Sequence, residues 1–255
     1  GETIASFPGA GATLDFSDDG SRVAFRIDRE DVAIATTNPF AVVARLKNVG
    51  ADVHHVRLVG DRLLALSRKA PMGVWDIPSG TRIASHETGV TKYPPFLLEV
   101  SPTGRYAVMG GLMAPIRVID LSTQVMIEPK VELGSALFGV ITVAFSPDGT
   151  RFAAASQDHM VRIFRLGEGA PELTLVGHTG PAHSVSFHPT EPRLASGSWD
   201  QTIRIWDTDT GREMAVLSGH GAPVHAVRFS TDGARLYSAS ADMVVVPGAE
   251  GDFGV

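Results

Sequence analysis

Three residues in the second half of the chain have the types that nucleophilic catalysis uses: His178, Ser196 and Asp200. A serine nucleophile must be exposed beside hydrogen-bond donors that stabilise an oxyanion. Ser196 lies inside the segment 194–198, which predicts a strand that buries this side chain. We therefore expect the three residues to have a structural role, and we expect no enzyme activity.

The elements that must position these residues repeat along the chain. An apolar-x-apolar pair recurs six times, and its second members lie 42, 42, 45, 42 and 42 residues apart. A period of about 40–45 residues is typical of a β-propeller, in which each repeat is one four-stranded blade. We predict an all-β propeller with six blades, with a truncated seven-bladed ring as the alternative. The pairs are Leu14/Phe16, Val56/Leu58, Leu98/Val100, Val143/Phe145, Val185/Phe187 and Val227/Phe229.

We expect one propeller domain over residues 1–255. The last repeat lacks a fourth strand, and the segment Glu2–Phe7 is similar to that strand in the preceding repeat. We expect this segment to close the ring by pairing with the C-terminal blade, because closure removes exposed sheet edges. The alternative is a frayed N-terminal arm. The predicted blades are 11–46, 53–88, 96–130, 140–176, 182–218 and 224–247, the last completed by 2–7.

Composition limits the class of function. The net charge is −6, without the basic character typical of nucleic-acid binders. The chain has no cysteine, which excludes disulfides and thiolate metal sites. No apolar run approaches about 20 residues, so we expect no transmembrane helix. We expect a cytoplasmic protein. The 18 arginines against 4 lysines suggest a bacterial gene, and a first residue other than Met suggests part of a larger protein.

The fifth repeat carries a specific motif. Its segments GHTGPAHSVSF (177–187) and LASGSWDQTIRIWD (194–207) closely resemble the WD-repeat family of β-propellers. The resemblance implies a buried hydrogen-bond chain through His178, Ser196, Asp200 and Trp206. In that chain the imidazole would join Ser196 to Asp200, and the indole N–H would donate to Ser196. Every buried polar atom would then have a partner.

The other repeats depart from this motif. Blade four keeps Asp158 but has Ala154 and Phe164 where the family has Ser and Trp. Blades one to three keep less. We expect these blades to be held by apolar packing rather than by the polar chain. Blade six keeps three members of the chain, His220, Ser238 and Asp242.

The residue between the two apolar residues of each pair points to the opposite face of the inner strand. Around a closed six-bladed ring, four consecutive blades have Arg228, Asp15, Arg57 and Glu99 there. The alternating signs predict ion pairs between adjacent blades. Because desolvation opposes the attraction between partly buried charges, we expect these pairs to fix blade order more than to add stability. The alternative is a charged channel that holds a small ion.

The resemblance also predicts the residues of the binding rim. In the family, the start of the inner strand and the residue before the turn aspartate face this rim. Trp199 is the main candidate, because large aromatic residues are frequent interface anchors; the alternative is that it packs flat on a neighbouring blade. For the histidines we expect pH-dependent binding between about pH 5 and 8 rather than a metal site, and we expect no cofactor. The rim candidates are Trp199, His183, His225, His54, Phe96 and Gln157.

The function that these features predict is a non-catalytic scaffold that presents its rim to a protein or peptide partner. We expect it to belong to a larger regulatory or signalling protein, whose other domains are further candidate partners. Neither nucleic acid nor a membrane is expected as a partner. Two alternatives stay open: a six-bladed propeller hydrolase or lactonase with a site at the channel mouth, and a structural assembly domain.

Overall fold

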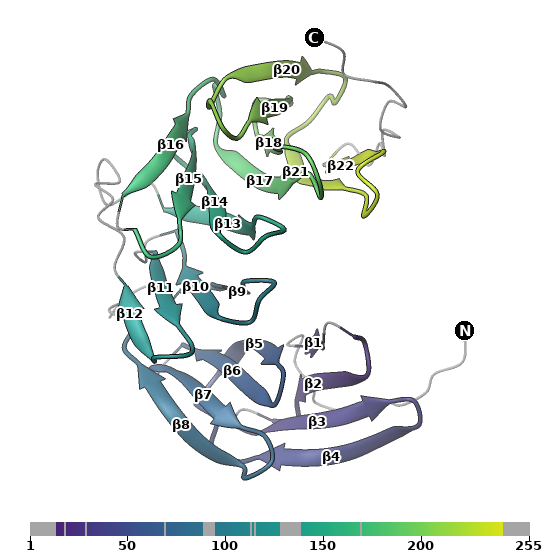
Figure 1. Ribbon diagram of the computed structural model, residues 1–255. Helices are drawn as coiled ribbons and strands as arrows, with labels where there is room; N and C mark the ends of the chain where they lie inside the picture. The colour runs from purple at the N-terminus through teal and green to yellow at the C-terminus, as the bar shows by residue number, and fades with distance from the viewer. Residues whose placement is uncertain are drawn as a thin grey trace. The chain divides into compact units, whose positions relative to one another are not determined.

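A computed structural model describes residues 14–241 of the chain, except residues 18, 29, 69, 89–94, 113, 115, 128–138 and 169. Every regular element in these residues is a β-strand (Figure 1). The strands form six sheets, five with four strands and one with two, so the all-β prediction is confirmed and each sheet is a propeller blade. None of the described residues forms a helix that could cross a membrane. The chain divides into two compact units, residues 1–100 and 101–255.

The first unit contains blades one and two and the inner strand of blade three. In both complete blades the strands follow one another in sequence order and pair antiparallel. Blade one consists of β1 (Leu14–Phe16), β2 (Arg22–Arg26), β3 (Val32–Thr37) and β4 (Phe40–Leu46). Blade two consists of β5 (Val53–Val59), β6 (Arg62–Ser67), β7 (Met72–Asp76) and β8 (Thr81–His86), and β9 (Leu97–Val100) follows.

The second unit begins with the remaining strands of blade three and contains blades four to six. The first of these strands are β10 (Tyr106–Gly110), β11 (Arg117–Asp120) and β12 (Val125–Ile127). Blade four is β13 (Val140–Phe145), β14 (Arg151–Ser156), β15 (Val161–Arg165) and β16 (Pro171–Leu175). Blade five is β17 (Ala182–Phe187), β18 (Arg193–Ser198), β19 (Ile203–Asp207) and β20 (Glu213–Leu217). Blade six is described through β21 (Val224–Phe229) and β22 (Leu236–Ser240).

Some sequence predictions fall outside the described residues. These include Asp242, the third strand expected after it, and the segment Glu2–Phe7 that was expected to close the ring. Closure of the ring, the number of blades in it and the single-domain organisation therefore stay predictions.

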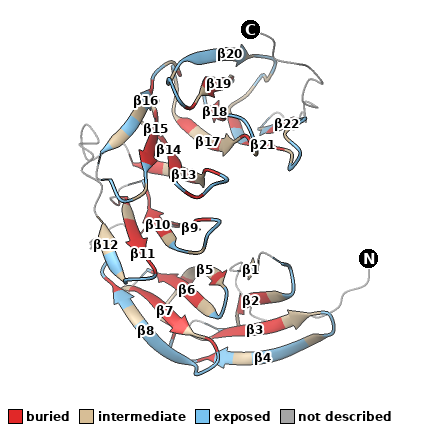
Figure 2. Cartoon of the chain, viewed as in Figure 1, coloured by how far each residue is buried: buried red, intermediate tan, exposed pale blue. Residues whose placement is uncertain are grey.

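Buried residues concentrate in the inner and middle strands of the sheets, whereas the outermost strands are largely exposed (Figure 2). In the second unit, Val161, Ile163 and Leu175 of blade four form one buried cluster with Val185 and Trp206 of blade five. A second cluster joins blade five to β21 and β22 of blade six. In the first unit, a third cluster joins blade one to blade two. The core is therefore a series of layers between sheets, as expected for stacked repeat units.

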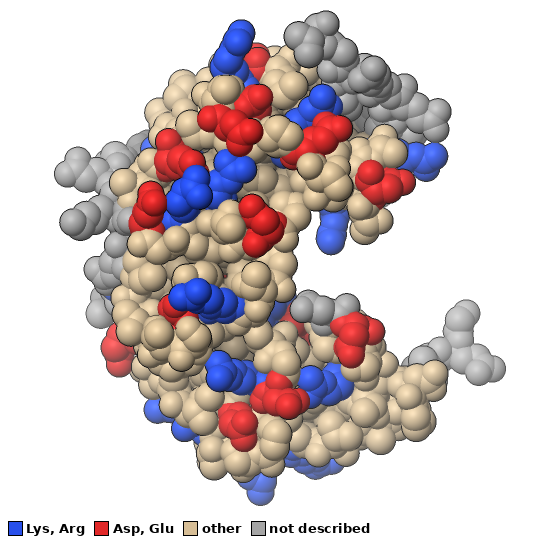
Figure 3. Space-filling view, in the orientation of Figure 1, with Lys and Arg blue, Asp and Glu red and all other residues tan. Residues whose placement is uncertain are grey.

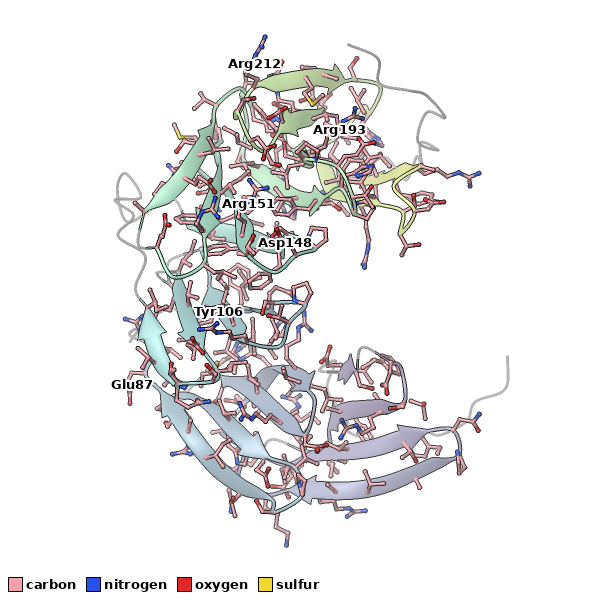
Figure 4. All side chains as sticks on the ribbon, viewed as in Figure 1. Glu87, Tyr106, Asp148, Arg151, Arg193 and Arg212 are labelled. Atoms are coloured by element: carbon pink, nitrogen blue, oxygen red, sulfur yellow. The ribbon has the colours of Figure 1, made fainter. Side chains whose placement is uncertain are left out.

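Polar contacts join the same blades at the surface, where acidic and basic side chains are interspersed (Figure 3). In the first unit, Arg22 of β2 donates to the carbonyl oxygen of Gly60, at 2.7 Å, and pairs with Asp61, at 2.9 Å. In the second unit, Arg151 at the start of β14 donates to the carbonyl oxygen of Thr208 in blade five, at 2.7 Å (Figure 4). Each arginine thus reaches from the second strand of one blade to a turn of the next.

Four outer strands, β4, β8, β16 and β20, are edge strands whose pairing is interrupted at one position, whereas β12 pairs with β11 without a shift. In each of the four, one residue has no partner on the neighbouring strand. Such β-bulges twist an edge away from further strand pairing, which protects it from aggregation. The bulged residues are Val43, Ile83, Glu172 and Met214.

The layer between blades five and six predicts the effect of one added methyl group. A Cβ atom at Gly197 would lie 2.7 Å from Val224 Cγ1 and 2.9 Å from Val227 Cγ1. We expect Gly197→Ala to lower the free energy of unfolding by about 1–3 kcal/mol, because the crowded valines must move. Denaturant unfolding measures this change.

Blade four offers a matched control for this prediction. One repeat earlier, Ala155 occupies the place of Gly197 and shares a buried cluster with Ala182, which occupies the place of Val224. The double variant Gly197→Ala/Val224→Ala copies that pair of small residues, so we expect it to recover part of the lost stability. Equal or greater instability of the double variant would contradict this explanation.

Candidate interaction surface on blades five and six

The four residues of the fifth repeat lie in one hydrogen-bonded chain. His178 Nδ1 is 2.8 Å from Asp200 Oδ2, and His178 Nε2 is 2.7 Å from Ser196 Oγ. The Trp206 indole N–H donates to Ser196 Oγ at 2.8 Å. Ser196 has an exposed fraction of 0% and Trp206 of 1%, so solvent does not reach the hydroxyl. A buried serine of this kind cannot receive an external substrate.

The contacts define the protonation state of this hydrogen-bond chain. Asp200 accepts from His178 Nδ1–H, which leaves Nε2 as the acceptor for the Ser196 hydroxyl, and that hydroxyl oxygen accepts the indole N–H. Burial lowers the pKa of His178 and favours this neutral form. Burial also raises the pKa of Asp200, but hydrogen bonds from Thr202, His178 and Thr179 outweigh it and hold that pKa well below its usual range. The four hydrogen-bonded side chains therefore carry one negative charge, on Asp200.

Hydrogen bonds hold the turn that follows β18, and one of their acceptors, Asp200, belongs to the polar chain. The Trp199 backbone N–H donates to Pro181 O at 3.0 Å, and Ser198 Oγ donates to Gly180 O at 3.0 Å. On the other side, Thr202 Oγ1 donates to Asp200 Oδ1 at 2.6 Å. Trp199 lies between these contacts, so its backbone is held from both sides while its side chain is 49% exposed.

Three aromatic side chains meet on this turn and form what we call the aromatic site: Trp199, His183 and His225. The rings of Trp199 and His183 are nearly parallel, with planes 18° apart and centroids 6.1 Å apart. The ring of His225 is roughly perpendicular to both, with its centroid 4.9 Å from that of His183 and 6.4 Å from that of Trp199. Two nearly parallel rings and a third at right angles thus form one aromatic group across blades five and six.

The histidines reach this site because each is the extra residue of a β-bulge. The register of β17 with β18 shifts between Ala182 and Ser184, and that of β21 with β22 shifts between Val224 and Ala226. The same shift falls at His54 in blade two and at Ile141 in blade four. A bulged residue can point away from the pleat of its strand. A recurrent bulge thus sets the direction of every one of these side chains.

His183 also links its blade to the next one. Its Nδ1 donates to the carbonyl oxygen of His225 at 3.1 Å, which leaves Nε2 as an acceptor in the neutral ring. Burial lowers the pKa of His183, partly offset by this hydrogen bond. The neutral form therefore dominates at pH 7. The sequence predicts His183 on the binding rim but carries no signal for this link between blades.

In the first unit, His54 and Phe96 form a separate group with a residue that sequence analysis missed. His54 Nε2 donates to the carbonyl oxygen of Pro95 at 2.8 Å, and Phe96 is exposed. The neighbouring His55 bonds to the Phe96 backbone, yet burial and the nearby Arg57 lower the pKa of His55 to about 4. The pair of adjacent histidines was the only signal in the sequence for this contact.

The remaining predicted residues show how the site differs between blades. Gln157 occupies in blade four the position that Trp199 occupies in blade five. The backbone N–H of Gln157 donates to Gly139 O at 3.1 Å. Blade four replaces the polar chain with stacked, buried Phe152 and Phe164, whose centroids are 4.8 Å apart. In blade six, His220 Nε2 lies 2.8 Å from Ser238 Oγ. Within the described residues, no three His, Asp or Glu side chains are grouped to hold a metal ion.

Three of the four predicted inner-strand charges form a network in the first unit. Arg57 Nη1 is 3.1 Å from Asp15 Oδ1, and Arg57 Nη2 is 2.7 Å from Glu99 Oε1. Asp15 Oδ2 also accepts from the Leu58 backbone N–H at 2.7 Å. Arg57 thus joins the inner strands of blades one, two and three. Arg228 belongs to the second unit, and its pairing with Asp15 stays a prediction.

The neutral state of His178 predicts how stability depends on pH. The folded-state pKa of His178 lies below the unfolded value of about 6.5, so its contribution is complete above pH 6.5 and is lost as the pH falls through the folded pKa. Protonation at Nε2 would also leave the Ser196 hydroxyl proton without its acceptor. We expect His178→Gln to lower the free energy of unfolding at pH 7 and to reduce its further loss between pH 7 and 5.

A matched control is the exposed His159, which has φ 71°. The next repeat already has glutamine at this position, because Gln201 has the same φ of 71°. His159→Gln should retain the wild-type dependence in urea unfolding at each pH. A decline in His178→Gln as large as in the wild type would show that another group is responsible.

The Arg57 network predicts a measurable coupling. In a double-mutant cycle of Arg57→Met with Asp15→Asn, we expect a coupling energy of about 1 kcal/mol, because both side chains are largely buried. The Arg22–Asp61 pair, whose aspartate is 70% exposed, is the control and should give less than about 0.5 kcal/mol. Equal couplings in unfolding experiments would contradict a special role for the inner-strand network.

Comparisons with known proteins agree with this geometry. Three segments match the family model described as WD domain, G-beta repeat: residues 132–165, 169–207 and 211–246. A comparison with curated proteins gave no match. Among solved structures, 1773 chains match. One is the computationally designed Ika8 protein, 20% identical, with a TM-score of 0.78 over 97% of this chain and 74% of that chain. At this identity the likeness shows the fold alone, and so widespread a fold does not define a function.

Proposed function

The chain carries WD repeats in three segments between residues 132 and 246, which confirms the resemblance of its fifth repeat, and from this premise we propose that it is a non-catalytic scaffold for protein interaction. WD repeats generally serve as interaction scaffolds. We further propose that the aromatic site of blades five and six is the surface that binds a protein or peptide partner.

One observation carries the second proposal: a half-exposed tryptophan on a turn that hydrogen bonds hold on both sides, one of them to Asp200 of the buried polar chain. Trp199 offers a large aromatic surface, its backbone N–H donates to Pro181 O, and the residues on either side of it, Ser198 and Asp200, are hydrogen-bonded as well. Tryptophan is among the residues that contribute most to interface affinity. A preorganised anchor also loses little conformational entropy on binding. The packing alternative accounts for only part of its surface, since Trp199 contacts His183 and His225 but remains 49% exposed.

The proposal extends to the setting of the protein. A regulatory or signalling role, a cytoplasmic location and partnership with other domains of a larger protein are consistent with the composition and the family. The polar residues of blade five support a structural rather than a catalytic role, because Ser196 is fully buried, its hydroxyl donates to His178 Nε2 and its oxygen accepts from the Trp206 indole N–H.

Substitution of the tryptophan tests the proposal. We expect Trp199→Ala to weaken binding of the partner at least tenfold while the fold is unchanged, since removing a central aromatic anchor typically costs 2 kcal/mol or more. The measurement is quantitative co-precipitation followed by calorimetry with the partner that the wild type captures. Tyr237→Ala is the control, because Tyr237 is another exposed aromatic residue in blade six. Equal affinity of Trp199→Ala and the wild type would overturn the proposal.

A further inference from the structure

We propose that the group recognised by the aromatic site is an arginine side chain of the partner, an inference that rests on the proposed function and specifies its ligand. The site consists of the Trp199 and His183 rings, nearly parallel, with the His225 ring across them. The negative face of an aromatic ring attracts a cation within about 6 Å, and a tryptophan ring does so most strongly. Such a surface favours a cationic group over an aliphatic one.

The charge of Asp200, the residue after Trp199, has the sign that attracts a cation. Asp200 directly follows Trp199, and the side chain of Asp200 is only 5% exposed. Its carboxylate is ionised, while its histidine partner His178 is neutral. The negative charge next to Trp199 is therefore not cancelled by that partner, and low exposure limits its screening by water. The net charge of −6 on the whole chain has the same sign and favours approach of a basic partner.

The site also provides a hydrogen-bond acceptor for such a group. Because His183 donates its Nδ1–H to His225 O, the neutral ring keeps a lone pair on Nε2. Burial and the neighbouring His225 lower the pKa of His183, and the hydrogen bond to His225 O opposes them, without a contribution from lysine or arginine. Among the described residues, neither lysine nor arginine lies over the Trp199 ring. The described part of the chain thus places no cation over this ring.

Arginine satisfies these features better than lysine. Its guanidinium is planar, stacks on an aromatic face and keeps N–H donors at its edge for an acceptor beside the ring. A lysine ammonium is a compact and strongly hydrated charge that cannot stack in this way. A carboxylate would be repelled by Asp200 and would find no positive partner at the aromatic site.

The test uses two peptides that differ in one group. Acetyl-Gly-Ser-Arg-Ser-Gly-amide is titrated into the full chain, and the same peptide with citrulline in place of arginine is the neutral isostere. We expect the arginine peptide to shift the NMR signal of the Trp199 indole N–H, and to bind about tenfold more tightly than the citrulline peptide. In Trp199→Ala the shifts of His183 and His225 should disappear. Tyr237→Ala should respond like the wild type, and His183→Ala should bind with reduced affinity.

The possible outcomes separate this inference from the proposed function. Equal affinity for the arginine and citrulline peptides, or tighter binding of a glutamate peptide, would overturn the arginine inference but leave the aromatic site as a binding surface. The absence of any Trp199 shift with the arginine peptide would also overturn the inference. The proposed function would then be judged by capture of the partner with Trp199→Ala, which does not depend on the chemistry of the ligand.

Discussion

Burial of apolar residues between successive blades is the constraint on which the rest of the structure depends. A single four-stranded sheet has two apolar faces and cannot cover either of them alone. In the second unit, blade four covers the inner strand of blade five, and blade five covers that of blade six. The fit is specific to each layer. Between blades four and five, Ala155 shares a cluster with Ala182; at the equivalent places between blades five and six, Gly197 lies against Val224. A larger residue on one blade is matched by a smaller one on the other, which keeps the spacing between the sheets.

Polar contacts then fix how neighbouring blades are aligned. Asp15 accepts from the backbone of Leu58, and Ser186 accepts in the same way from Phe229, in each case 43 residues along the chain. The bulged histidines do the reverse, since His54 and His183 donate to carbonyl oxygens of the following blade. These contacts satisfy backbone groups that would otherwise be left unpaired at an interface. The period of the sequence is therefore also a period of hydrogen bonds between blades.

The buried polar chain of blade five is not needed to form a blade. Blade four replaces it with the stacked Phe152 and Phe164 and with an ion pair of Arg162 with Asp158, at 2.7 Å. The turn after the second strand is held by the same backbone contact in both blades, since Gln157 N–H donates to Gly139 O as Trp199 N–H donates to Pro181 O. What the chain adds in blade five is Asp200, which also accepts from the Thr179 N–H and the Thr202 hydroxyl beside Trp199. In blade four the same turn presents Gln157.

The sequence by itself determined the blade unit and the members of the polar chain. Its period locates the strands, because turn residues and alternating apolar residues act locally. The family motif then identified His178, Ser196, Asp200 and Trp206 as a set. It did not reveal that Trp199, His183 and His225 meet, that His183 and His54 link adjacent blades, or that His55 bonds to the Phe96 backbone. Only the tertiary structure decided these points. They depend on β-bulges that redirect single side chains and on how closely one sheet approaches the next, and neither is encoded in the pattern of any one repeat.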